Sequence, residues 1–114
     1  MAGTDAGYLN TYDYPGLAIH LELALMVKYG LTPQQALSAS IVNGPAYFGL
    51  ESDYGAIEKG KKASLIILRL NPLDNIENTQ STESVVKDGQ FYSRKELDQL
   101  LSEIKKWVKN KETN

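Results

Sequence analysis

Apolar side chains follow a helical pattern before residue 50 and a strand pattern after it. Residues 17–29 consist of strong helix formers and stop at Gly30, a residue suited to the end of a helix. Apolar positions occur almost all round this segment, and only His20, Glu22 and Lys28 interrupt them. Such a helix is normally buried on most faces. A free-standing small chain has difficulty doing this, so we expect neighbouring structure that is missing or is supplied by another copy.

A second helix is predicted to begin after Thr32. Pro33 suits the first helical position, and Gln35 completes a capping box with Thr32. The helix should end before the Asn-Gly-Pro sequence at 43–45, because the residue before proline avoids the helical region. Residues 46–50 predict a further short helical turn, closed by Gly49.

The composition changes at residues 51–55, and after this point the apolar residues follow the pattern of β-strands. Residues 64–70 are β-branched and apolar on both faces, as in a buried strand. Residues 84–87 and 90–92 flank Asp88-Gly89, a strong hairpin signal. Residues 94–109 predict an amphipathic helix with Ser93 as its N-cap and Glu96 in its first turn.

Length and composition limit the classes of protein that remain possible. The chain has 114 residues, which suits one small domain and is too short for a complete (β/α)₈ barrel of roughly 200 residues or more. It has no cysteine and one histidine, which excludes disulfides, thiolate metal sites and any site built from several of its own histidines. A net charge of −2 gives no reason to expect nucleic acid or an anionic membrane as partner. No targeting segment or membrane span is visible, so the default is a soluble protein.

Asp5 is the candidate chemical residue of most interest. It lies between small residues in the loop predicted over residues 1–16, where a carboxylate can reach an ion or a substrate, although taken alone this pattern more often marks an Asx-turn. His20 and Glu22 are two positions apart and do not share a helix face, so they make a poor metal site. We therefore interpret His20 as a hydrogen-bonded structural histidine.

The remaining polar residues favour structural roles. Asp53, Asp74 and Asp88 lie in turn sequences, and Ser38, Ser40 and Ser81 have no local partner that would activate a nucleophile. The lysine cluster at 59–62 could bind phosphate but more often marks a solvated turn. Tyr8, Tyr12 and Tyr14 could line a pocket near Asp5 or pack within their own loop. Pattern and composition alone lead no further than a soluble α/β fragment with one loop carboxylate of interest.

Six ordered segments resemble the C-terminal end of metal-dependent amidohydrolases, nearest to the imidazolonepropionase-related and prolidase-like branch. They are GTDAG (3–7), PGLAIHLELALMVKYGLTPQQAL (15–37), NGPAYFGL (43–50), YGAIEKGKKASLIIL (54–68), NPLDNI (71–76) and VVKDGQFYSRKELDQLL (85–101). Each is weak alone, but their succession over the chain is specific.

The resemblance implies an α/β fold made of two parts. Residues 1–50 would be the last loop and helices of a (β/α)₈ barrel. Residues 51–114 would supply strands of a small β-sandwich domain and the C-terminal amphipathic helix. Asp5 would be the family's metal-binding aspartate at the end of the last barrel strand, and it would also act as general base toward the attacking water. Substrate-binding residues are not assigned.

The chain also departs from the family pattern. The His-x-His pair, the bridging Lys or Glu and the two later histidines are absent, and His20 matches none of them. Ser64 replaces an aspartate that the family usually has, which affects the local sandwich rather than the metal site. One carboxylate cannot hold a catalytic zinc, which takes about three protein ligands. We therefore expect that the N-terminal part is missing, that this chain binds no metal alone, and that it is inactive by itself.

Three hypotheses follow. In the first, the chain is the C-terminal fragment of a cytoplasmic hydrolase that cleaves a C–N bond in a small amide, cyclic amide or dipeptide with a divalent metal, zinc in our expectation. In the second, it is a non-catalytic module that self-associates through the apolar surface around Leu21–Val27. In the third, it completes an enzyme by binding a separate chain with the rest of the barrel. None of them involves nucleic acid or a membrane.

Overall fold

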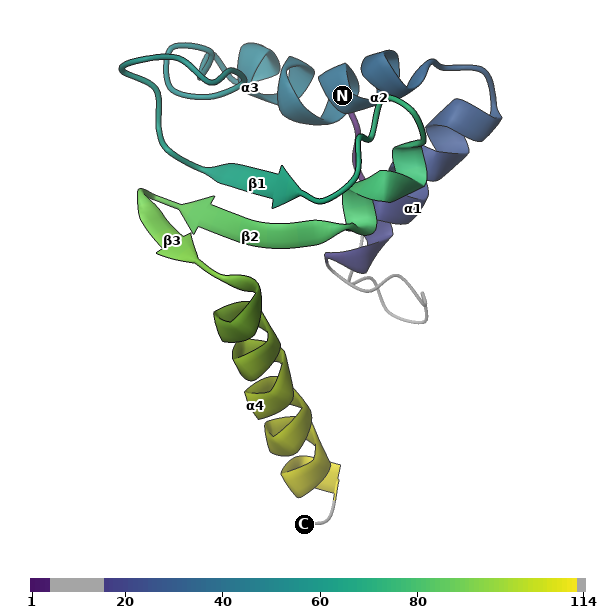
Figure 1. Cartoon of the computed structure of the whole chain (residues 1–114). Coiled ribbons are helices and arrows are strands. Elements are labelled where there is room, and N and C mark those ends of the chain that lie inside the picture. The colour runs from purple at the N-terminus through teal and green to yellow at the C-terminus, as the bar shows by residue number, and fades with distance from the viewer. Residues whose placement is uncertain (5–15, 113–114) are drawn as a thin grey trace.

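The computed structural model describes residues 1–4 and 16–112, and it shows helices, then a small sheet, then a long helix (Figure 1). The long C-terminal helix extends away from the other elements. The order of predicted elements is confirmed, with one short 3₁₀ helix added between the first two strands. The elements are α1 (Leu17–Lys28), α2 (Pro33–Ile41), α3 (Asn43–Tyr47), β1 (Leu65–Leu68), η1 (Ile76–Gln80), β2 (Thr82–Lys87), β3 (Gln90–Tyr92) and α4 (Arg94–Glu112).

Local signals set the helix ends as predicted. The Thr32 hydroxyl accepts from the Gln35 N–H at 3.2 Å, while the Thr32 N–H donates to the Gln35 side chain at 2.9 Å. Gly30, just past α1, has a φ of 121°, a value that side chains disfavour. The third helix begins at Asn43, three residues earlier than predicted. Pro45 is tolerated there because the first N–H groups of a helix have no partner inside it.

The three strands form one antiparallel sheet in the order β1-β2-β3. The predicted hairpin between β2 and β3 is confirmed, with Lys87 paired to Gln90 across the turn. Asp88 and Gly89 have φ values of 50° and 82°. Two consecutive residues with positive φ are typical of a type I′ turn, whose twist matches that of the two strands it joins.

The prediction that the first strand is buried on both faces is wrong for the described structure. β1 lies at the edge of the sheet, and Ile66 and Ile67 are 63% and 45% exposed. Apolar residues on both faces of a strand need cover on both sides. Within the described residues that cover is absent.

The hydrophobic core is small and lies where α1, α2 and η1 meet. Leu23, Ala36 and Ile76 form its centre, with Ala18 and Ala39 also buried. The core therefore joins the helical part of the chain to the segment that leads into β2. The predicted boundary between residues 50 and 51 stays a prediction.

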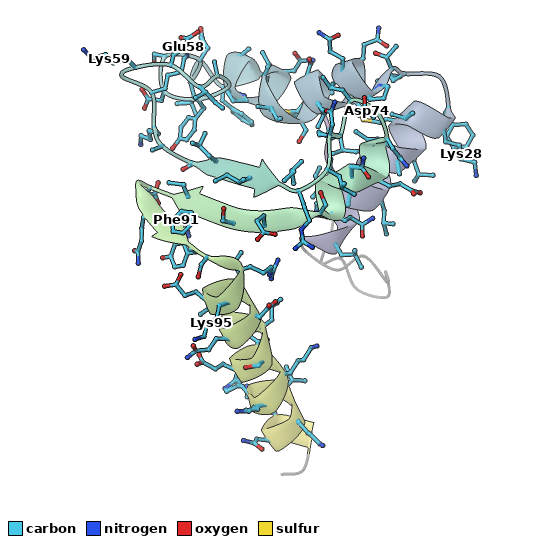
Figure 2. The ribbon with its side chains drawn as sticks, in the orientation of Figure 1. Lys28, Glu58, Lys59, Asp74, Phe91 and Lys95 are labelled. Atoms are coloured by element: carbon cyan, nitrogen blue, oxygen red, sulfur yellow. The ribbon has the colours of Figure 1, made fainter. Side chains whose placement is uncertain are left out.

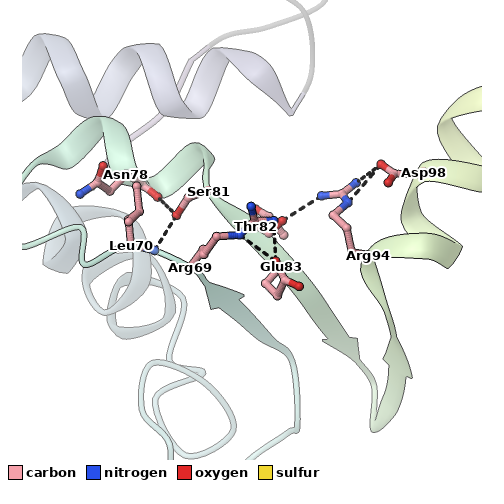
Figure 3. Close-up of polar contacts among 8 residues, drawn as sticks. All are labelled: Arg69, Leu70, Asn78, Ser81, Thr82, Glu83, Arg94 and Asp98. Carbon is pink, nitrogen blue, oxygen red and sulfur yellow. Dashed lines mark hydrogen bonds and ion pairs between the residues drawn. The ribbon is translucent and has the colours of Figure 1, made fainter.

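Polar contacts fix the ends of the strands (Figure 3). Ser81 accepts from the Leu70 N–H at 3.0 Å and donates to the Asn78 carbonyl at 2.7 Å. Arg69 forms an exposed ion pair with Glu83, with the nearest N and O atoms 2.7 Å apart. These contacts hold η1 against the turn that follows β1.

Candidate active-site loop

The predicted site residue, Asp5, lies outside the described residues, as do Tyr8, Tyr12 and Tyr14. The two ends of this segment are described. The Ala2 N–H donates to the Ala39 carbonyl at 3.0 Å, which attaches the chain to α2 just before Asp5. At the other end, Gly16 leads directly into α1 with a φ of 90°. Helices α1 and α2 therefore hold both ends of the segment that carries Asp5.

His20 is hydrogen-bonded, as the sequence predicted. Its Nδ1 atom lies 3.0 Å from the hydroxyl oxygen of Thr79, a residue of η1 far away in sequence. The Thr79 hydroxyl donates its one proton to the Ile76 carbonyl at 2.9 Å. The imidazole must therefore donate from Nδ1, and the neutral form carries its proton there. Burial lowers the pKa of His20, which favours that neutral form.

Sequence reasoning missed Thr79 as the partner of His20. The two residues are 59 positions apart, and neither belongs to a motif that would connect them. The pair links α1 to η1 beside the core. A local sequence signal could not have found it, because the pairing depends on how the two elements pack.

The other candidate carboxylates have the turn roles that the sequence suggested. Asp53 accepts from the Ser52 hydroxyl at 3.3 Å and lies 3.9 Å from the Lys62 amine. Asp88 occupies the hairpin turn. Asp74 is exposed, and its N–H donates to the Asn71 carbonyl at 3.3 Å in the turn after β1. These aspartates do not converge on one site.

The lysine cluster at 59–62 contains one residue with a structural role. Lys61 is largely buried and its amine donates to the carbonyls of Glu51 and Tyr54, which closes the loop before β1. Lys59 projects outward with Glu58 (Figure 2). The cluster therefore stabilises a loop, and it does not form a phosphate cradle.

A metal ion does not fit the described residues on their own. No three His, Cys, Asp or Glu side chains in residues 1–4 and 16–112 lie close enough together to hold one. Asp5 alone could not complete a catalytic centre, because one carboxylate provides too few ligands. No reaction step can therefore be derived from this chain alone.

An open apolar groove of about 580 Å³ lies between α1 and η1. Leu21 and Leu25 line it and are 50% and 46% exposed, and Asn75 and Glu77 contribute from the other side. This is the surface around Leu21–Val27 that the sequence pattern singled out. Within the described part of the chain, no helix is both long and apolar enough to cross a membrane.

Comparison with known proteins identifies the family. The sequence pattern of the Amidohydrolase family matches residues 1–91, which include both ends of the segment that carries Asp5, strands β1 and β2, and the first two residues of β3. The chain belongs to the amidohydrolase family. Helix α4 begins beyond the matched residues.

Similarity to individual proteins supports this assignment. An imidazolonepropionase of Clostridium tetani is 34% identical over 82 residues, which cover 68% of this chain and 20% of that protein. A Xaa-Pro dipeptidase with bound methionine is 30% identical with a TM-score of 0.62, over 65% of this chain and 18% of that one. Phenylurea hydrolase B is 30% identical with a TM-score of 0.65, over 69% and 17%. The chain spans 10–21% of the length of the imidazolonepropionases it matches.

Proposed function

We propose that this chain is the C-terminal part of an amidohydrolase that cleaves a C–N bond in a small amide, cyclic amide or dipeptide. The observation that carries the proposal is the family match over residues 1–91, which contains the GTDAG segment. The similarity to an imidazolonepropionase and to a Xaa-Pro dipeptidase supports this range of substrates. Residues 1–50 would belong to the barrel, and residues 51–114 to the sandwich and the terminal helix.

Within the complete enzyme, Asp5 is the residue of this chain that takes part in the chemistry. It would serve as one metal ligand, and its carboxylate would accept the proton of the attacking water and pass that proton to the leaving nitrogen. A divalent metal, zinc in our expectation, supplies the acidity of that water when it is bound. The attachment of Ala2 to α2 and the start of α1 at Gly16 support a fixed position for both ends of the loop.

The fragment alone is inactive in this proposal, because its described residues hold no metal cluster and Asp5 is a single ligand. The test is to assay the purified chain with zinc or manganese against Xaa-Pro dipeptides and cyclic amides. We expect no hydrolysis above that of the Asp5→Asn variant. Steady hydrolysis that depends on the metal and is lost in Asp5→Asn would overturn the claim that the fragment is inactive.

The proposal that this chain is the C-terminal part of a longer hydrolase has a separate test. That test is the genomic sequence directly upstream of the codon for Met1. The proposal expects the reading frame to continue and to encode a His-x-His pair and two more histidines. If no such histidines are encoded there in frame, the remaining barrel must come from a separate chain, or the hydrolase proposal fails. Co-purification with a histidine-rich barrel chain distinguishes these two results.

The second candidate is a self-associating module that uses the groove between α1 and η1, with a second copy as the occupant. The exposed Leu21 and Leu25 favour it. A Leu21→Asp/Leu25→Asp variant that keeps the wild-type mass in light scattering would exclude this interface.

A further inference from the structure

The junction between α2 and α3 contains a backbone carbonyl that bonds outside both helices. The last bond of α2 runs from the Val42 N–H to the Ser38 carbonyl at 3.0 Å. The next carbonyl along the chain, that of Ala39, accepts instead from the Ala2 N–H at 3.0 Å. In an uninterrupted helix its donor would be the N–H of Asn43, four residues further on. The interruption at Val42 therefore leaves the Ala39 carbonyl available to the N-terminal segment.

The residues around this bond are packed against one another. Figure 1 shows the N-terminus beside α2. Ala39 is 7% exposed, and Ala36, three residues earlier on the same face, is fully buried. Met1 lines an open hollow of about 520 Å³ together with Ala39 and Asn43. The small side chain of Ala39 thus lets the N-terminal segment approach α2 closely enough for a backbone hydrogen bond.

Pro45 explains why the helix is interrupted at this point. It has no N–H for the Ile41 carbonyl, and its ring would clash with that carbonyl in an uninterrupted helix. Because α3 begins anew at Asn43, Pro45 falls in a first turn, where N–H groups have no partner inside the helix. Val42, between the two helices, has φ and ψ angles of −99° and −49°, so its departure from helical geometry is small. Without the proline, α2 and α3 can therefore merge with little rearrangement.

Merging the two helices would remove the attachment of the N-terminal segment. In a continuous helix the Ala39 carbonyl points along the axis toward the Asn43 N–H, and it is drawn away from Ala2. Asp5 follows Ala2 by three residues, which reach at most about 11 Å. A shift of Ala2 by a few ångströms therefore changes what Asp5 can reach.

We propose that Pro45 is a positioning residue for Asp5, and that it acts by keeping the Ala39 carbonyl available to the Ala2 N–H. Pro45 itself touches no reacting atom in this proposal. The inference rests on the proposed role of Asp5 in hydrolysis, and it adds a device in the fold that places the segment carrying that residue.

The first test identifies the donor to the Ala39 carbonyl in the 114-residue chain. Scalar couplings across hydrogen bonds, measured in a long-range HNCO NMR experiment, connect an amide nitrogen with the carbonyl carbon that accepts its proton. Wild type should show the coupling from Ala2 to Ala39, and Pro45→Ala should replace it by the coupling from Asn43 to Ala39. Wild type without the Ala2 coupling, or a Pro45→Ala chain that keeps it, would overturn the proposal.

Pro33→Ala is the matched control. Pro33 occupies the first position of α2 and is partly exposed, as Pro45 is. Its replacement by alanine relaxes the unfolded chain in the same way, but it leaves the interruption at Val42 in place. The coupling from Ala2 to Ala39 should therefore remain. If Pro33→Ala loses it as Pro45→Ala does, the effect comes from general destabilisation and the proposal fails.

Kinetics of the complete enzyme test the positioning role. Pro45→Ala should lower kcat by about 10- to 100-fold, because a misplacement of about 1 Å can cost 100-fold in rate. KM should stay within about twofold, and Pro33→Ala should keep both constants within about twofold. Ala2→Pro, which removes the donor N–H itself, should lower kcat as much as Pro45→Ala, and the double variant should lose no more than either. Additive losses, or a raised KM with unchanged kcat, would contradict the proposal.

Asp5→Asn separates this inference from the proposed function on which it rests. If Asp5→Asn abolishes hydrolysis while Pro45→Ala keeps the wild-type kcat, the hydrolase proposal stands and the positioning role of Pro45 is overturned. A fully active Asp5→Asn enzyme would contradict the proposed function, and with it any role of Pro45 in placing Asp5 for catalysis.

Discussion

Replacing Thr79 by valine should weaken the packing contact between α1 and η1 without changing the shape of that contact. The Thr79 hydroxyl accepts from His20 at 3.0 Å and donates to the Ile76 carbonyl at 2.9 Å, and the residue is 7% exposed. Each hydrogen bond contributes about 1 kcal/mol net, so the loss of both should lower the free energy of unfolding by about 2 kcal/mol. Urea unfolding followed by far-UV circular dichroism measures this difference.

Thr79→Ser is the matched control, because it keeps the hydroxyl and removes one methyl group. It should cost about 1 kcal/mol from lost apolar burial. A double-mutant cycle of Thr79→Val with His20→Ala isolates the contact between the two residues, and we expect a coupling of about 1 kcal/mol. The reasoning is refuted if Thr79→Val is as stable as Thr79→Ser, or if the two substitutions in the cycle are additive.

Three further predictions test other local features. Gly89→Ala should cost about 1 kcal/mol in thermal unfolding, since Gly89 has a φ of 82°, whereas Gly3→Ala, in open space without a positive φ, should have little effect. Burial lowers the pKa of His20 below 6.5, so the contribution of the neutral imidazole to stability is present above that pH and is lost as the pH falls. His20→Gln should therefore make the free energy of unfolding, measured by urea titration, less sensitive to a change from neutral to mildly acidic pH. Hydrogen bonds from Ser93 lower the pKa of Glu96 below 4.5, so an NMR titration should find that carboxyl titrating below its usual range in wild type and closer to that range in Ser93→Ala.

The sequence predicted the local elements well where a residue type enforces a backbone conformation. The capping box at Thr32, the glycine after α1, the Asp88-Gly89 turn and the cap at Ser93 act within a few residues, and all four are present. The start of α3 was wrong by three residues, because proline is compatible with a first helical turn as well as with a helix end.

Properties that depend on distant parts of the chain were less accessible. The apolar pattern of β1 predicted burial, but burial requires a second layer that the described residues do not provide. The contact between His20 and Thr79 depends on packing between α1 and η1. The site residue Asp5 came from resemblance to a family and not from periodicity, since a lone loop carboxylate carries no signal of its own.

The central claim is that Asp5 is the residue through which this chain takes part in amidohydrolase chemistry. The most direct measurement is the rate of amide or dipeptide hydrolysis by the complete enzyme, with the missing barrel supplied in frame or by a second chain. Asp5→Asn should lower kcat/KM by at least about 100-fold, as expected for loss of a general base. Asp74→Asn, the same change at an exposed turn, should leave the rate within about twofold. An Asp5→Asn enzyme that hydrolyses its substrate as fast as Asp74→Asn would contradict the claim.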